Sequence, residues 1–299
     1  MISWRYHLVS IVAVFLALAL GVLAGTAVVN QGLVKNLTTT TDRLNQENAD
    51  YRAQIGQLSD YMNQASTVIE SLRLNQVDVI LITDDGADPA ALNQVRSALS
   101  VAGANVVTTL VPLASLLSTD PVDTKALADV IGAPAQANPA LLPGMTAEIL
   151  AARLAQGPPP AARPGQQDVL ANLLSGGFID TREPGVKSAA DIGIPGAVIV
   201  VSGPTEGATT APSTFMVPLV RALSSQGVVV AAGEARPAPD GFVALVKQDG
   251  AGVGPRVTVD DLESALGGTA LVVALQRAID QRTGGDYGLG SGQLLPPLT

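Results

Sequence analysis

Residues 8–29 read LVSIVAVFLALALGVLAGTAVV, an apolar stretch without a charge, whose only polar side chains are Ser10 and Thr26. A helix needs roughly 20 apolar residues to cross the hydrocarbon core of a bilayer. We therefore predict a transmembrane anchor over residues 1–32. The alternative is a cleaved signal peptide, since Gly25 and Ala27 are small residues suited to a cleavage site. The apolar region of a signal peptide is normally shorter, about 7–15 residues.

The charges that flank this stretch predict its orientation. Arg5 lies on the short N-terminal flank beside Trp4 and Tyr6, which are typical of the membrane interface. The first charge on the other side is Lys35. Because cytoplasmic flanks carry the excess of positive charge, we expect a single-pass protein with a cytoplasmic N-terminus and an extracytoplasmic bulk.

Small residues recur at every fourth position of the anchor and share one helix face. They are Ala13, Ala17, Gly21 and Gly25. Such a face allows two membrane helices to approach closely, so it predicts a dimer contact. The alternative is that small residues are simply frequent in membrane helices.

A heptad pattern follows over residues 33–76. Its core positions are Leu37, Thr41, Leu44, Asn48, Tyr51, Ile55, Leu58, Met62, Ala65, Ile69 and Leu72. The pattern predicts a parallel coiled-coil homodimer, and an Asn at a core position favours two helices in register. The alternative is one amphipathic helix that packs on its own domain.

The composition excludes several classes of site. The chain has 299 residues, a net charge of −9 and no cysteine, and His7 is its only histidine. The negative charge argues against a nucleic-acid partner. Without His or Cys beyond the anchor, the chain cannot form a Ser-His-Asp triad or a zinc site with imidazole or thiolate ligands. We expect a non-enzymatic protein without a cofactor.

Residues 77–285 carry the signals of an α/β domain. An apolar strand at Val77–Thr83 is followed by a helix at Ala90–Val101 and a strand at residues 104–112. This β-α-β order predicts a mostly parallel sheet flanked by helices. Further predicted helices cover residues 124–131, 146–154, 166–174, 215–225 and 269–281. Further predicted strands cover residues 197–204, 227–234 and 242–247, and a short strand precedes Asp260. A proline-rich loop at residues 157–165 is a possible division between two lobes, and residues 286–299 are predicted to be a flexible tail.

Two acidic groups follow predicted strands, where ligands of parallel sheets usually bind. One group is Asp84, Asp85 and Asp88, and the other is Asp260 and Asp261. If the two strands were adjacent, these carboxylates could hold Mg²⁺ or Ca²⁺. The alternative is that they cap helices and shape turns, with Asp260 as a candidate helix cap.

Copper sites need other residue types. Cu(I) is bound by Cys or Met sulfur and Cu(II) commonly by imidazole. Beyond the anchor, only Met62, Met145 and Met216 offer such atoms, and they are far apart in sequence. We expect all three to lie in apolar cores and predict no selective copper site within one subunit.

Both ends of the chain resemble the actinobacterial copper transport protein family. The matching stretches are MISWRYHLVSIVAVFLALALGVLAG at the start and VTVDDLESALGGTALVVALQRAIDQRTGGDYGLG near the end. The order of anchor, coiled coil and α/β domain is also similar, so the resemblance covers essentially the whole chain. One departure is Asp286 beside Tyr287, where the family's pattern implies a histidine.

The resemblance implies two different roles. The family's name implies copper transport or copper homeostasis across the cell envelope. Corynebacterial relatives are instead linked to cell separation, where they work with a second membrane protein and control a peptidoglycan hydrolase. No copper-binding residue can be carried over to this chain, because no residue of the right chemical type is present. The residues here fit the scaffold role better than a metal carrier.

Overall fold

The computed structural model describes residues 4–71, 73–134, 136–160, 168–182, 185–186, 188–203, 213–250 and 254–297, without the side chains of residues 26–34. It contains two compact units, Met1–Asp60 and Tyr61–Thr299. The elements in chain order are α1 (Trp4–Glu70), β1 (Asp78–Thr83), α2 (Pro89–Val101), β2 (Asn105–Pro112), η1 (Ala114–Leu117), α3 (Pro121–Ile131), η2 (Pro139–Leu141), α4 (Leu142–Gln156), α5 (Val169–Ser175), β3 (Ile179–Arg182), η3 (Ala189–Asp191), β4 (Ala197–Val201), α6 (Met216–Ser225), β5 (Val230–Gly233), α7 (Phe242–Asp249), β6 (Arg256–Val259), α8 (Ala265–Gln281) and β7 (Gly285–Tyr287).

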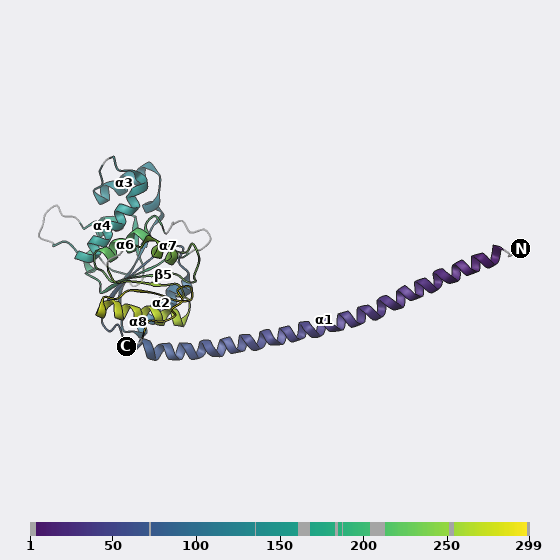
Figure 1. Cartoon of the computed structure of the whole chain (residues 1–299). Coiled ribbons are helices and arrows are strands. Elements are labelled where there is room, and N and C mark those ends of the chain that lie inside the picture. The colour runs from purple at the N-terminus through teal and green to yellow at the C-terminus, as the bar shows by residue number, and fades with distance from the viewer. Residues whose placement is uncertain are drawn as a thin grey trace. The chain divides into compact units, whose positions relative to one another are not determined.

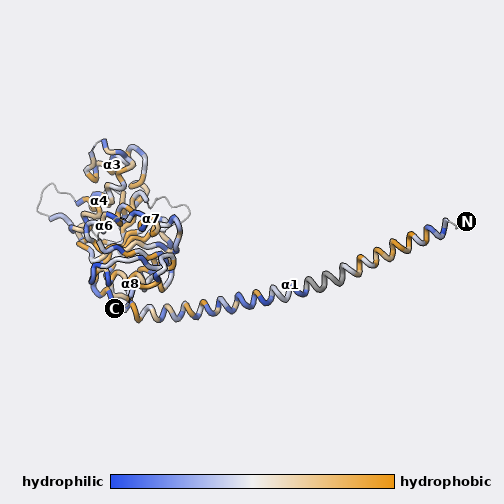
Figure 2. The backbone as a smooth tube through the Cα atoms, viewed as in Figure 1, coloured by the Kyte–Doolittle hydropathy of each residue, from blue (hydrophilic) through white to orange (hydrophobic). Residues whose placement is uncertain are grey.

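The first helix, α1, contains the apolar stretch and most of the heptad pattern. Its segment Trp4–Gly25 is long and apolar enough to cross a membrane, and none of it is buried by the rest of the chain. Figure 2 shows this apolar segment near the N-terminus, followed by a stretch of mixed polarity. The predicted N-terminal apolar helix is therefore confirmed, whereas the coiled coil stays a prediction.

The strands form one sheet in the order β3-β2-β1-β4-β5-β6-β7. All neighbours pair in parallel except β2 and β3, which are antiparallel. The central strand β4, with the sequence AVIVV, is buried at every residue. A continuous apolar run is what a strand covered on both faces requires. The predicted α/β class and mostly parallel sheet are confirmed.

Helices cover both faces of this sheet. Figure 1 shows α2 and α8 on one side, with α4, α6 and α7 on the other. Alternate residues of the strands point into the two layers: Ile199 packs with the α2–α8 cluster, and Val198 and Val200 pack with the cluster that includes Leu150 and Leu219. Strands from both sides of the proline-rich loop join the same sheet.

Several local predictions differ from the structure. Residues 242–247 were expected as a strand but form helix α7. Short apolar runs do not distinguish strand from helix, and here Phe242, Val243 and Val246 form one buried helical face. Strands β3 and β7 had no predicted counterpart. Strand β7 crosses the expected boundary at residue 285, and its Tyr287 is buried.

The last turns of α1 pack on α8. Ser66 and Glu70 are buried there, and the Thr269 hydroxyl lies 2.8 Å from Ser66 Oγ and 2.7 Å from Glu70 Oε1. Arg73 Nη1 also donates to Gln276 Oε1 at 2.7 Å. The domain therefore begins before its first strand, within the part of α1 for which the heptad pattern predicts coiled-coil contacts.

Candidate functional site

Buried polar side chains gather at the carboxyl edge of the parallel sheet. Asp84 follows β1, Ser202 follows β4, Glu234 follows β5 and Asp260 follows β6, and all four are buried. The chain leaves β1 in one direction along the sheet to form β2, and it later returns to form β4 on the other side of β1. This reversal between β1 and β4 is the place where open α/β sheets usually bind ligands.

The two predicted acidic groups do not meet. Asp84, Asp85 and Asp88 follow β1, while Asp260 and Asp261 follow β6, and β4 and β5 lie between these strands. The condition for a shared cation site, adjacent strands, is therefore not met. Within the described ranges, no group of three or more His, Cys, Asp or Glu residues could hold a metal ion.

Asp84 instead joins the loops that leave β1 and β4. Its Oδ1 accepts a hydrogen bond from the Gly86 N–H at 3.1 Å, and its Oδ2 accepts one from the Ser202 hydroxyl. Burial raises the pKa of Asp84 to about 6, while these hydrogen bonds act in the opposite direction. The Asp84 carboxyl group therefore links the loop after β1 to the loop after β4, at the topological reversal of the sheet.

Three other predicted carboxylates also shape the backbone. The pairs are Asp88 Oδ1 with the Ala90 N–H at 2.7 Å, Asp260 Oδ1 with the Gly290 N–H at 3.1 Å, and Asp261 Oδ2 with Ser264 Oγ at 2.7 Å. Asp88 is the N-cap of α2, as predicted. The cap of α8 is Ser264 rather than Asp260, because Asp260 points toward the C-terminal turn. Capping and turn formation therefore account for these three side chains, and Asp85 is exposed.

Glu234 and Lys247 belong to this edge but were not among the predicted residues. Glu234 Oε2 accepts a hydrogen bond from the Val243 N–H at 3.3 Å, at the start of α7, where the N-cap Gly241 has no side chain to offer. Burial raises the pKa of Glu234, and the nearby Asp260 adds to this. Lys247 Nζ lies 3.6 Å from Asp260 Oδ2. Glu234 is the last residue of a predicted strand. It could have been found from the sequence, because the aspartates were selected as acidic residues at the ends of predicted strands.

Two hollows lie along this edge and share the wall formed by Pro237 and Ala238. The larger, of about 400 Å³, is lined by Glu234, Lys247 and Asp260. The smaller, of about 230 Å³, lies at the β1–β4 reversal. Its remaining lining includes Gly86, Asp88, Gly203 and Arg236.

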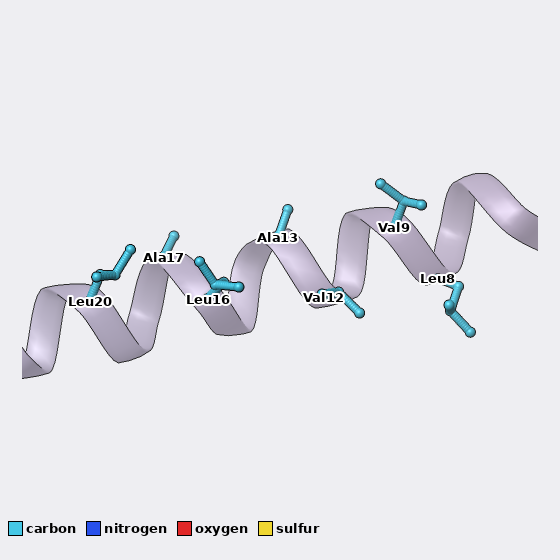
Figure 3. A pocket seen from close by; sticks show the side chains of 7 residues that line it. All are labelled: Leu8, Val9, Val12, Ala13, Leu16, Ala17 and Leu20. Atoms are coloured by element: carbon cyan, nitrogen blue, oxygen red, sulfur yellow. The ribbon is translucent and has the colours of Figure 1, made fainter.

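The apolar segment of α1 exposes a row of apolar side chains, shown in Figure 3. They are Leu8, Val9, Val12, Ala13, Leu16, Ala17 and Leu20. Ala13 and Ala17, from the predicted dimer face, point to the same side of the helix. A Cβ atom added at Gly21 or Gly25 would meet no other atom. The small-residue face is thus open along its length.

The predicted coiled-coil core divides into two parts. Leu37, Thr41, Leu44, Asn48, Tyr51, Ile55 and Leu58 are exposed, whereas Met62, Ala65 and Ile69 are half-buried. Leu72 lies outside the described residues. The seam up to Leu58 therefore has no cover from the described part of its own chain.

The methionines offer no convergent set of sulfur atoms. Met216 lies in the core on the α4–α6 side of the sheet, and Met145 packs against the same cluster. Met62 is half-buried in the last turns of α1. The surroundings of Met145 and Met216 agree with the expectation that these side chains fill apolar space, whereas Met62 is only half-buried.

Comparison with known proteins places the whole chain in one family. Residues 1–296 match the family described as "Copper transport outer membrane protein, MctB". The proteins named "Copper transporter MctB" from Mycobacterium tuberculosis (strain ATCC 25618 / H37Rv) and Mycobacterium bovis are 26% identical over 313 residues, which cover 98% of each chain. The chain therefore belongs to the MctB family of copper transport outer membrane proteins, and this membership supports a membrane location and a role in copper transport.

Proposed function

We propose that this protein supports copper transport as a single-pass, non-enzymatic scaffold that binds other envelope proteins and does not itself hold copper. The observation that carries the proposal is the ligand inventory. The chain has no cysteine, and its single histidine is His7 on the N-terminal flank. Beyond the anchor, Met145 and Met216 pack with the apolar core and Met62 is half-buried on α1. Selective copper sites are built from these residue types, so copper would be handled by a partner.

The exposed surface of α1 supports the scaffold role. Its apolar segment Trp4–Gly25 suits a bilayer, and the flanking charges favour a cytoplasmic N-terminus with the domain outside. The helix face that carries Ala13 and Ala17 and the exposed seam from Leu37 to Leu58 would both be covered in a parallel homodimer. In this arrangement, two α/β domains are tethered to one membrane.

The cell-separation role is the second candidate. Asp84, Asp88, Asp260 and Asp261 are engaged in loop and helix hydrogen bonds, so they favour a binding domain over a carboxylate–metal enzyme. A tethered binding domain suits the control of a peptidoglycan hydrolase together with a second membrane protein, the role implied by the corynebacterial relatives. A deletion strain with normal copper tolerance but chained, undivided cells would select this role.

The copper proposal is tested in a deletion strain complemented with variants of the full-length protein. Loss of copper tolerance on deletion is expected, with full restoration by the combined variant Met62→Leu, Met145→Leu and Met216→Leu, alone or with His7→Gln. Leu matches Met in volume, so the fold should persist. A variant that is present at wild-type levels in the membrane but fails to restore tolerance would show that these side chains handle copper directly.

Pairing is tested separately by crosslinking in native membranes. A cysteine at Leu44 or Leu58, on the exposed seam, should form a disulfide dimer, and a cysteine at Asp42 or Asp60, off the seam, should not. Equal crosslinking at all four positions, or none at the seam, would contradict a coiled-coil dimer.

A further inference from the structure

The smaller hollow at the carboxyl edge is an open recess, which described residues of the β1–α2 and β5–α7 loops line together with Gly203 after β4. Gly86 and Gly203 come close together in its wall, because a Cβ atom on Gly203 would lie 3.3 Å from the Gly86 carbonyl oxygen. The buried bond between Asp84 and Ser202 ties the same two loops together. The hollow lies at the point of the sheet where ligands of such folds usually bind.

Opposite charges face this hollow from two different loops. Asp88 comes from the β1–α2 loop and Arg236 from the β5–α7 loop, and both line the recess. The pKa of Arg236 is raised, mainly by Glu263, whose Oε1 accepts a hydrogen bond from Arg236 Nε at 2.6 Å, and also by the charge of Asp88. The two side chains are therefore within electrostatic reach of each other.

Each of these side chains keeps part of its hydrogen-bonding capacity. Asp88 uses Oδ1 for the Ala90 N–H, and Arg236 uses Nε for Glu263. To the other described residues, Asp88 Oδ2 and the two terminal nitrogens of Arg236 make no hydrogen bond that meets ordinary geometry. One free carboxylate oxygen and one free guanidinium edge can thus receive a ligand that carries both charges.

We propose that this hollow binds a small zwitterion, a free amino acid or dipeptide, with its ammonium group on Asp88 and its carboxylate on Arg236. The volume of about 230 Å³ is below the roughly 300–1,000 Å³ of pockets for drug-sized ligands, so the hollow suits a smaller molecule. This binding role is independent of copper.

Calorimetric titration of the detergent-solubilised full-length protein with alanylalanine tests the assignment. Saturable binding is expected, at least tenfold weaker for N-acetyl-alanylalanine and for alanylalanine amide, each of which lacks one charge. The variants Asp88→Asn and Arg236→Gln should each weaken alanylalanine binding at least tenfold. Asn also caps helices, so Asp88→Asn should leave α2 intact.

The matched control is Asp120→Asn. Asp120 precedes Pro121 and caps α3 through the Val122 N–H at 2.8 Å, as Asp88 precedes Pro89 and caps α2. Because Asp120 does not line the hollow, its variant should bind alanylalanine as the parent does. The proposal is overturned by an absence of saturable binding, by equal binding of the three compounds, or by unchanged binding in Asp88→Asn and Arg236→Gln.

Discussion

Two apolar helices of this protein have opposite surroundings. Helix α6 buries Leu219, Val220 and Leu223 within the domain. The segment Trp4–Gly25 of α1 is at least as apolar, yet it exposes its large side chains, including Phe15 and Leu16. Apolar composition alone therefore does not make a core, because apolar side chains stabilise the fold only where another surface buries them. For an exposed apolar helix, a bilayer or a second helix can provide that surface.

The ion pairs repeat the same contrast. Arg153 and Asp168 form a buried pair with contacts of 2.8 Å from both Nε and Nη2, and Arg153 also donates to the carbonyls of Ala189 and Ile192. On α1, Arg43 and Glu47 are exposed and 3.6 Å apart. In the domain the two charges are shielded from water and solvate each other, whereas on α1 water still solvates both charges.

The largest expected effect comes from breaking the buried pair. Asp168→Ala should lower the free energy of unfolding by about 3–5 kcal/mol, because Arg153 is left buried without its counter-charge. Hydrogen exchange of the β1 and β4 amides in the full-length protein measures this loss. Glu47→Ala removes the exposed partner and should cost only about 0.3–0.5 kcal/mol of local helix stability. Equal losses of stability in the two variants would contradict the contrast between the buried ion pair of the domain and the exposed pair on α1.

The next effect compares one leucine from each apolar helix. Leu219→Ala should cost the domain about 2–5 kcal/mol, because it leaves a cavity beneath α6. Leu16→Ala should leave domain stability unchanged, since Leu16 is exposed and belongs to the other compact unit. Hydrogen exchange of the β4 amides in the two variants compares these effects. A destabilised domain in the Leu16 variant would mean that the anchor contributes to the domain's core.

Sequence reasoning succeeded where burial produced a simple pattern. The continuous apolar run at Ala197–Val201 predicts a strand covered on both faces, and Asp88 before Pro89 predicts a helix start. It did not find β3 or β7, because each pairs only at the edge of the sheet and has few apolar residues. Residues 242–247 were assigned to a strand because a one-sided apolar face of a short helix looks like a short apolar run.

The candidate site was only partly predictable, because strand order is not encoded locally. The aspartates after β1 and β6 could be selected from the sequence, but two intervening strands separate them. The hollow between Asp88 and Arg236 depends on the neighbouring positions of β1, β4 and β5, and those arise from pairing between distant segments. The same holds for the exposed seam of α1. A heptad pattern identifies the apolar face of a helix, but it does not identify the surface that packs against that face.

A pH titration tests burial at the carboxyl edge of the sheet. The pKa of Asp84 is about 6 in the folded chain and 3.8 as its reference value, so the folded state holds the proton to higher pH. Unfolding free energy should therefore fall as pH rises from about 4 to about 6, by up to about 3 kcal/mol at 1.36 kcal/mol per pKa unit. Chemical denaturation across this range should show a smaller fall in Asp84→Asn. Asp60→Asn, on the exposed part of α1, should keep the wild-type profile.

The smallest effect concerns the end of α1, where the exposed helix becomes part of the domain. Thr269→Val preserves shape but removes the hydroxyl beside the buried Glu70 and Ser66, so it should cost about 1–3 kcal/mol. Hydrogen exchange should report the loss in residues 62–70 and not in residues 37–58, because only the former pack on the domain. Thr67→Val is the control, since the Thr67 hydroxyl bonds only to its own helix, at Asn63 O, and is exposed. If Thr269→Val left residues 62–70 as protected as before, the polar cluster would not be what fixes α1 to α8.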